Sequence, residues 1–428
     1  MKKITAILIL FSLVVQIFAV DIRVGSLRNE WSQNDTSFTL VATIFSSGEA
    51  PQHREPFQVL YMIDVGDRFA GNVRQEFING GIEIVNSLAD TDFFGIILYN
   101  EYSFTLLPLS EIGAIGRERI RTMMSEISTE RRRLRDPLSA LDRVVAEFSQ
   151  NQGRRSDGRV LVMTVLGETM EDGHGNAYDM RFAKKMNNLG VSVFTVGHGD
   201  DFDEIAAISV AEATGGRAYF VGQNERADIL KTRFASIAYK ITTPHSKNIS
   251  IDFITRDAIS PVCFGDSVLA NVRITRISTN DTINLFFDAR NRPRRSSDID
   301  IDFQYDDISM RANLSGNSSF RINLTRGTSE FSPSAPRILR HKILLNLARS
   351  IDQLKIGDRN FRRDYAEGFR RMLETRLGPI RNEINTREIQ QVFMEMVSIH
   401  DMIAGGTASN AFIAKYVRYQ LHYSRFSH

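Results

Sequence analysis

The middle of the chain alternates short apolar runs with amphipathic stretches. Runs such as VLYMID (Val59 to Asp64), RVLVMTV and VSVFTVG have the length and composition of buried strands. Strands that alternate with helices are joined by right-handed crossovers, which makes neighbouring strands parallel. We therefore predict that residues 57–238 form a doubly wound, mostly parallel α/β sheet with helices on both faces. The helices are expected at Phe69 to Leu88, Pro137 to Phe148, Met180 to Asn188, Asp203 to Ala213 and Arg226 to Ala238. One pair of runs, FFGIILYN and SFTLLPLS, is separated by a hairpin-length gap and is predicted to be antiparallel.

Beyond residue 246 the pattern changes to alternation of apolar and polar residues. Segments such as NISIDFI, TINLFFDA and IDIDFQY predict an all-β sandwich over residues 247–331. Within residues 20–50, the stretch from Ser37 to Phe45 also has a strand pattern. Because an isolated strand is only marginally stable, we expect this segment to join the sandwich, so that the α/β part is an insertion.

The last part of the chain, residues 337–428, is predicted to be a helical region. HKILLNLARSIDQL and REIQQVFMEMVSIHDMI both carry apolar residues at helical spacing. We expect Met394, Met396 and Met402 to pack in its core.

The N-terminus resembles an export signal. Two lysines precede an apolar run, and Ala19 stands at a suitable cleavage position, so residues 1–19 are predicted to be a signal peptide, with the mature chain starting near Val20. The alternative is an uncleaved anchor, although the run is short for a membrane span. No later apolar run has the length of a span.

The single Cys263 excludes an internal disulfide and is expected to be a buried small side chain. These features predict a bacterial protein of the periplasm or cell surface.

Composition narrows the class of partner. Lys and Arg number 53 and Asp and Glu 51, so the formal charge of +2 provides no basic field for nucleic acid. No Gly-x-Gly-x-x-Gly, phosphate loop or Gly-x-Ser-x-Gly elbow follows a predicted strand, which argues against an enzyme on this sheet. No cofactor is implied.

Three stretches together resemble a von Willebrand factor type A (VWA) domain. They are VLYMIDVGDRF, DTDFFGIILYNEYSF and LGVSVFTVGHGDDFDEIAAISVAEATGGRAYFV, within residues 57–238. In the last, a strand ends at His198, a helix follows, and ATGGRAYFV turns directly into another strand. The resemblance implies a doubly wound sheet and an adhesion site where an Asp, two Ser, a Thr and a second Asp hold Mg²⁺.

The residues at those five positions do not suit Mg²⁺. Asp64 matches the first acid, but Gly66 and Arg68 stand where the two Ser would be. The Thr position falls on Arg135 or Asp136, and the second Asp position falls on Leu166. With the neutral oxygen ligands missing, dehydration of Mg²⁺ is not compensated, so the resemblance implies a degenerate site. We predict that Asp64 pairs with Arg68 or Arg135 instead; the alternative is an exposed Asp64 without such a pair.

Two other metal sites remain open. Asp64, Asp67, Asp136 and Glu168 would form a rebuilt carboxylate site. His174 and His198, together with Glu168 or Asp200, would hold a transition metal. The competing explanation for these loop acids is capping of the helix that begins near Asp203.

The function favoured by the sequence is an exported, metal-independent module that binds another protein or acts as a scaffold. Loops at the carboxyl ends of the strands form the interaction surface of a doubly wound sheet. The candidate surface residues are Asp64, Asp67, Arg68, Arg135, Asp136, Glu168 and His198. A cation-dependent adhesin with the rebuilt site is the alternative, and an enzyme is the weakest hypothesis.

Overall fold

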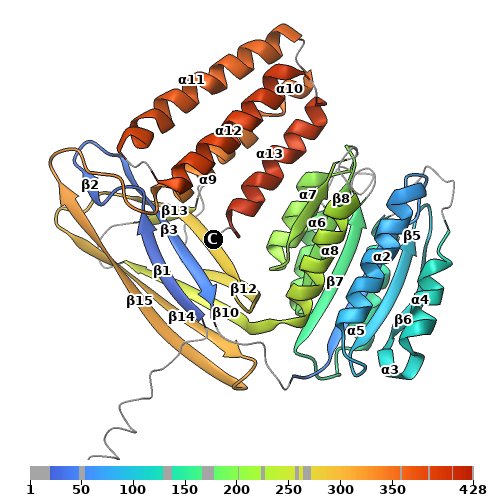
Figure 1. Ribbon diagram of the computed structural model, residues 1–428. Coiled ribbons are helices and arrows are strands. Elements are labelled where there is room, and N and C mark those ends of the chain that lie inside the picture. The colour runs from blue at the N-terminus through green and yellow to red at the C-terminus, as the bar shows by residue number, and fades with distance from the viewer. Residues whose placement is uncertain are drawn as a thin grey trace, which may run out of the picture.

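The computed structural model describes residues 20–47, 54–128, 137–165, 178–200, 202–222, 227–255, 260–263, 271–356, 359–383, 386–406 and 408–426. In Figure 1 they form an α/β unit, a region of β-sheet and a group of C-terminal helices. The predicted signal peptide, residues 1–19, lies outside the described residues. None of the helices that are described is long and apolar enough to cross a membrane.

The α/β unit is built on a six-stranded sheet with the order β6-β5-β4-β7-β8-β9. Its strands are β4 (Phe57–Asp64), β5 (Phe93–Tyr99), β6 (Ser103–Glu111), β7 (Gly158–Val165), β8 (Val191–His198) and β9 (Ala218–Val221). All neighbours are parallel except β5 and β6, which are antiparallel. The predicted doubly wound sheet and its antiparallel pair are confirmed.

Helices cover both faces of this sheet because its central strand is apolar on both sides. Val59, Tyr61 and Ile63 of β4 belong to one buried cluster, whereas Leu60 and Met62 belong to another on the opposite face. The first face is covered by α2 (Gly71–Ser87), α3 (Ile112–Ile115), α4 (Arg117–Ser125) and α8 (Ala227–Thr242), and the second by α5 (Pro137–Gln150), α6 (Tyr178–Asn188) and α7 (Glu204–Ala213). The helices α3 and α4 were not predicted, because the mostly polar segment of α4 buries only Ile120 and Met124.

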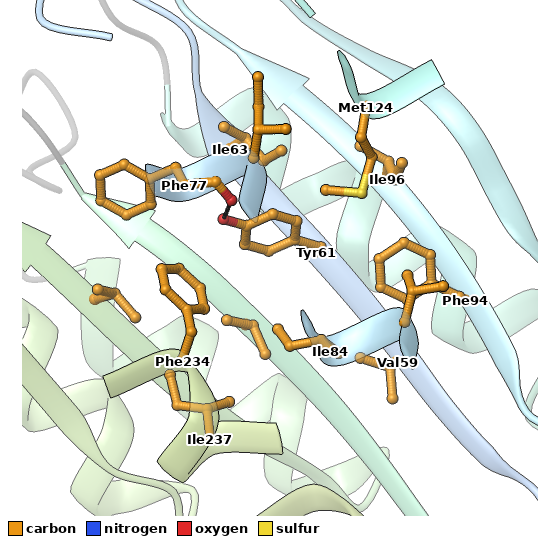
Figure 2. Close-up of a cluster of buried hydrophobic side chains, with 14 of the residues drawn as sticks. Val59, Tyr61, Ile63, Phe77, Ile84, Phe94, Ile96, Met124, Phe234 and Ile237 are labelled. Carbon is orange, nitrogen blue, oxygen red and sulfur yellow. Dashed lines mark hydrogen bonds between the residues drawn. The ribbon is translucent and has the colours of Figure 1, made fainter. Parts of the chain in front are cut away.

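The first cluster shows how closely the helices approach one another (Figure 2). The ring of Phe234 on α8 lies edge-on to the rings of Tyr61 and Phe77, with centroids 6.0 and 5.7 Å apart. The Tyr61 hydroxyl donates to the Phe77 carbonyl at 2.8 Å, which satisfies a fully buried polar group. A Cβ on Gly80 of α2 would lie 2.3 Å from the Phe234 ring, so glycine is required where α2 passes α8.

The segment ATGGRAYFV connects α7 directly to β9, as predicted. Gly215 has a φ of 69°, a conformation that side-chain-bearing residues rarely adopt. A Cβ on Gly216 would lie 1.9 Å from the Val193 carbonyl oxygen. The paired glycines thus bring the chain against β8 before β9 begins.

The β region contains two sheets, with the orders β1-β3-β13-β11 and β12-β10-β14-β15-β2. The first sheet's strands are β1 (Val20–Ser26), β3 (Ser37–Ser46), β11 (Ser260–Cys263) and β13 (Thr282–Arg290), and the second's are β2 (Glu30–Ser32), β10 (Pro244–Thr255), β12 (Asn271–Ser278), β14 (Ser297–Asp307) and β15 (Ala312–Thr325). Residues of both sheets share one buried cluster, with Leu40 and Phe287 from the first and Ile251 and Ile301 from the second. A sandwich that is a domain in its own right, with the limits 247–331, stays a prediction.

The N-terminal strands pair with strands that lie far along the chain. β3 is antiparallel to β13, from Ser37 opposite Arg290 to Phe45 opposite Thr282. The strand predicted at Ser37 to Phe45 therefore does join this sheet, and the α/β unit follows between the two partners. The expectation of one strand before residue 50 was too low, because β1 and β2 are also present. β2 is too short, and β1 too mixed in burial, for either to show a clear alternation.

The C-terminal region is helical, as predicted. It comprises α9 (Ala335–Ser350), α10 (Gln353–Ile356), α11 (Arg359–Glu383), α12 (Arg387–Gly405) and α13 (Asn410–Ser424). Met396 is fully buried and Met402 packs against the core, but Met394 is 65% exposed, so its predicted core position is wrong. Met394 lies on the solvent-facing side of the amphipathic α12.

Helix α13 joins the C-terminal region to the α/β unit through buried charges. Lys415 pairs with Glu204 of α7, and both side chains are about 5% exposed. Arg418 contacts the second oxygen of the same carboxylate. Lys415 hydrogen-bonding and charge lower the pKa of Glu204 against the opposing effect of burial. Lys415 and Arg418 therefore share one buried acid, while Arg418 also pairs with the exposed Asp352. The buried pair with Lys415 makes the acid costly to remove.

The same helix also caps the edge strand of the α/β sheet. His422 Nε2 accepts the Ala218 N–H at 3.1 Å, and the Tyr423 hydroxyl accepts the Phe220 N–H at 3.2 Å. Because Nε2 accepts, His422 is neutral and its Nδ1–H donates to Glu212 Oε1 at 2.7 Å. Two outward amides of β9 are satisfied in this way, and the edge is closed to other strands.

Replacement of Glu204 tests how much the contact with Lys415 and Arg418 contributes to the free energy of unfolding. Glu204→Ala leaves the buried Lys415 without its carboxylate and Arg418 with the exposed Asp352 alone, and we expect a loss of about 3 kcal/mol in the free energy of unfolding. The control is Glu367→Ala on α11, where the partners Arg370 and Arg371 are exposed and the loss is expected to be much smaller. Urea denaturation measures both variants. Equal losses would show that α13 is not held by this charge.

Acid is expected to weaken the packing of α9 against β13 and α13 through His341 of α9. Its ring is stacked on Phe286 at 3.9 Å, and burial, aided by the charge of Arg425, lowers its pKa to about 3. The unfolded chain binds the proton near pH 6.5, so stability falls as the pH drops from about 6.5 towards 3. Between pH 6.5 and 4.5 the loss from this group is expected to be about 2 to 3 kcal/mol.

Urea midpoints between pH 7.5 and 4.5 measure this effect. The carboxylates begin to contribute below about pH 5, and comparison with a His341 variant separates their contribution from that of the imidazole. His341→Gln keeps a polar side chain for Ser424, which lies 2.7 Å from Nδ1, and should flatten the pH profile. An unchanged profile in the variant would assign the acid sensitivity to another group.

Candidate interaction site at the carboxyl edge of the sheet

The parallel strands β4, β5, β7 and β8 end at one edge of the α/β sheet, where the predicted surface residues were expected. Asp64 is the last residue of β4 and His198 the last of β8. Asp67 and Arg68 follow β4 and are both exposed. The structure thus brings four of the seven predicted residues to this edge. The other three, Arg135, Asp136 and Glu168, lie outside the described residues.

Asp64 is fully buried, so the alternative of an exposed Asp64 is wrong. Its N–H donates to Thr164 Oγ1 of β7 at 2.9 Å, and its Oδ1 accepts the Gly66 N–H at 3.0 Å. Tyr99 of β5 donates its hydroxyl to the Thr164 carbonyl at 2.9 Å. The start of the loop is therefore held by both neighbouring strands. Thr164 and Tyr99 were not singled out from the sequence, where they appear only as members of apolar runs.

The loop after Asp64 combines a fixed backbone with exposed charges. The Phe69 N–H donates to the Gly66 carbonyl at 2.9 Å, which closes a tight turn, and the Phe69 ring is fully buried. Asp67 and Arg68 lie between these two anchors and face solvent. The ion pair of Asp64 with Arg68, or with Arg135, stays a prediction.

His198 lies against the core rather than in open solvent. It is half-buried, and its ring is edge-on to Phe77 with centroids 6.4 Å apart. Burial lowers its pKa, while the charge of Asp200 raises it. Asp203 accepts the Ala206 N–H at 3.0 Å, so the predicted cap of this helix is confirmed.

The metal hypotheses depend partly on residues that are not described. Within the described ranges, no group of three or more His, Cys, Asp or Glu side chains is arranged to hold a metal ion. The rebuilt site needs Asp136 and Glu168, and the transition-metal site needs His174 or Glu168, all outside those ranges. Both hypotheses therefore stay predictions.

Exposed apolar side chains occur at the same edge and were not predicted. Tyr102 is 62% exposed and Phe104 42% exposed, at the turn between β5 and β6. Met180 and Ile205, in the first turns of α6 and α7, are 55% and 54% exposed. The aromatic residues within the polar turn NEYSF were the available sequence signal. Exposed apolar residues on loops and element ends along one edge of a sheet are typical of a protein-binding surface.

The turn that carries Tyr102 is held in place by polar contacts. The Asn100 N–H donates to the Tyr102 carbonyl, and Asn100 Oδ1 accepts the Tyr102 N–H, both at 2.9 Å. Ser103 Oγ accepts from both Ser139 Oγ and Arg143 Nε of α5 at 2.8 Å. The turn is thus joined to a helix of the unit, which limits the ordering cost of binding there.

Substitution of Asp64 tests whether a metal or an arginine balances its charge. If an arginine does, Asp64→Ala leaves a cation uncompensated and is expected to cost about 3 kcal/mol, and millimolar Mg²⁺ should leave the melting temperature unchanged. The control Asp67→Ala removes an exposed charge and should cost less than about 1 kcal/mol. Stabilisation by Mg²⁺ that disappears in Asp64→Ala would show that the site binds metal.

Comparison with known families and with curated proteins finds no match for this chain. Solved structures do match. A von Willebrand factor type A protein from Catenulispora acidiphila has a TM-score of 0.60 at 12% identity, over 79% of this chain and 82% of that one. The ArnB paralog VWA2 from Sulfolobus acidocaldarius has a TM-score of 0.59 at 12% identity, over 95% of this chain and 98% of that one.

Both likenesses concern the fold, because the identities are low. The second extends over nearly the whole chain and so includes the β region and the C-terminal helices. Two features of this chain agree with the fold of these two structures. They are the strand order with its single antiparallel pair and the Gly-Gly turn into β9. The α/β unit of this chain has the fold of a von Willebrand factor type A domain.

Proposed function

We propose that this chain is an exported module that binds another protein, or organises a scaffold, through the loops at the carboxyl edge of its VWA domain. The observation that carries the proposal is the set of exposed apolar side chains at this edge, next to the charged pair Asp67 and Arg68. Aromatic side chains with a charged surround are the residues that contribute most to protein–protein binding. The lysine-led apolar N-terminus supports export to the periplasm or cell surface.

We propose that binding does not require a divalent cation. Gly66 is buried and has no side-chain oxygen, and Arg68 carries a positive charge at the position of the second hydroxyl ligand. Asp64 Oδ1 already accepts a backbone N–H within its own loop. A cation would lack neutral ligands and would meet a guanidinium. A rebuilt site containing Asp64, Asp67, Asp136 and Glu168 predicts the opposite, namely binding that a chelator abolishes.

No enzymatic role is part of this proposal. The described part of the edge combines a buried carboxylate, a half-buried imidazole and exposed apolar groups. The sequence contains no phosphate loop or nucleophile elbow that would give these side chains a role in catalysis.

Affinity capture of the tagged chain from the envelope of its own cells tests the proposal, in parallel with and without EDTA. We expect Tyr102→Ala combined with Phe104→Ala to reduce recovery of a partner on the order of tenfold, because exposed aromatic anchors are lost. The matched control is Met394→Ala on α12. It removes an apolar side chain of similar exposure from the C-terminal helical region instead of the α/β unit. EDTA should leave recovery unchanged.

Two results would contradict the proposal. Equal recovery with the double variant and with the control would place the partner elsewhere on the molecule. Loss of recovery in EDTA, restored by added Mg²⁺, would establish the cation-dependent alternative.

A further inference from the structure

Strand β15 leaves most of one side without a neighbouring strand. It pairs with β14 over eleven residue pairs, from Asp307 opposite Ala312 to Ser297 opposite Ile322, without a shift of register. On its other side β2 pairs only with Asn323–Thr325. Among the described residues, no strand pairs with that side of residues 312–322. Figure 1 shows β15 along the outer side of the β region, away from the α/β unit.

This edge lacks the devices that usually prevent strands from pairing between molecules. Protected edges carry charges, proline or bulges, or are covered by another element. Residues 312–320 contain no charged residue and no proline, and β15 has no bulge against β14. The remaining described edges are different: β9 is capped by α13, and the other edge strands carry Asp21 and Arg23 (β1), Glu30 (β2), Pro108 (β6), Pro261 (β11) and Arg273 (β12).

The free stretch is also complementary to itself. In an antiparallel pair with a twofold axis at Asn317, all eleven residues from 312 to 322 find a partner. On the inward face Leu314 lies opposite Phe320 of the second copy; both are half-buried and already pack against the core of the β region. On the outward face Arg321 lies opposite Asn313, so no like charges meet. Cross-strand pairs of this kind are what stabilise an antiparallel sheet.

We propose that two copies of this chain associate through β15, in antiparallel register about Asn317, and that their five-stranded sheets become one continuous sheet. The contact is isologous, since each copy contributes the same strand, and it closes as a dimer. It leaves the carboxyl edge of each VWA domain available, so it is separate from the proposed function.

A charge-swap pair tests this register. Ser315 lies opposite Ser319 of the second copy, and each of the two positions is exposed. Ser315→Lys with Ser319→Lys places like charges across the axis twice, whereas Ser315→Glu with Ser319→Lys places opposite charges there. The two variants share the lysine beside Asp300, which Ser319 contacts in the natural chain, and differ only at position 315. Sedimentation equilibrium of the purified full chain measures association, and circular dichroism checks folding.

The natural chain is expected to be a dimer, the Lys–Lys variant a monomer, and the Glu–Lys variant a dimer with a dissociation constant at least roughly tenfold below that of Lys–Lys. A monomeric natural chain, a Lys–Lys variant that dimerises as well as Glu–Lys, or the absence of dimer in both variants would overturn the proposal. As a second readout, Asn317→Cys in a Cys263→Ser background should form a disulfide-linked dimer in air. Asn271→Cys on β12 is the matched control, and equal crosslinking of the two would also overturn it.

Discussion

The buried carboxylate of Glu204 and the cations of α13 form the contact on which the arrangement of the whole molecule depends. Lys415 and Arg418 reach it from the C-terminal helix, while Glu204 itself is the first residue of α7 in the α/β unit. Leaving buried charges of this kind unpaired is strongly destabilising, so the contact favours the position of α13 in which they are paired. That position also brings the backbone of α13 to the β region, where the Asn284 N–H donates to the Arg425 carbonyl at 2.6 Å. A single helix thereby contacts all three parts of the chain.

This junction has a consequence for the sheet of the α/β unit. In a doubly wound sheet the two edge strands are the places where foreign strands pair. The β9 edge is closed by His422 and Tyr423, and the β6 edge carries Pro108. Strand pairing is thus discouraged at both edges of the sheet, which is consistent with the loops at its carboxyl edge being the surface that we propose for recognition. The contacts of Asp64 with Thr164 and Gly66 hold the first of these loops from within the sheet.

The two proposed surfaces have different physical characters. The loop edge presents aromatic side chains and charges, which recognise the shape and charge of a partner. The β15 edge presents backbone amides and carbonyls with small polar side chains, which recognise another strand. A molecule paired through β15 would carry two loop edges, and a partner with repeated sites would then bind the second edge at a high effective concentration. Weak individual contacts at the loops would be sufficient in such an arrangement.

The sequence by itself determined the α/β unit, because a strand buried on both faces must be apolar throughout, and VLYMID and VSVFTVG are. It also indicated the pairing of Ser37 to Phe45 with the later strands and the position of Asp64 at a strand end. It did not show that Asp64 is buried, or that Thr164 of another strand accepts its N–H. Nor did it show the role of α13, whose buried face includes Lys415 and His422. A pattern of apolar residues does not identify these two positions. Lys415 is buried only where a carboxylate distant in sequence neutralises it, and the neutral His422 only where both ring nitrogens find hydrogen-bond partners. Only the tertiary structure brings Glu204 and Glu212 to that face.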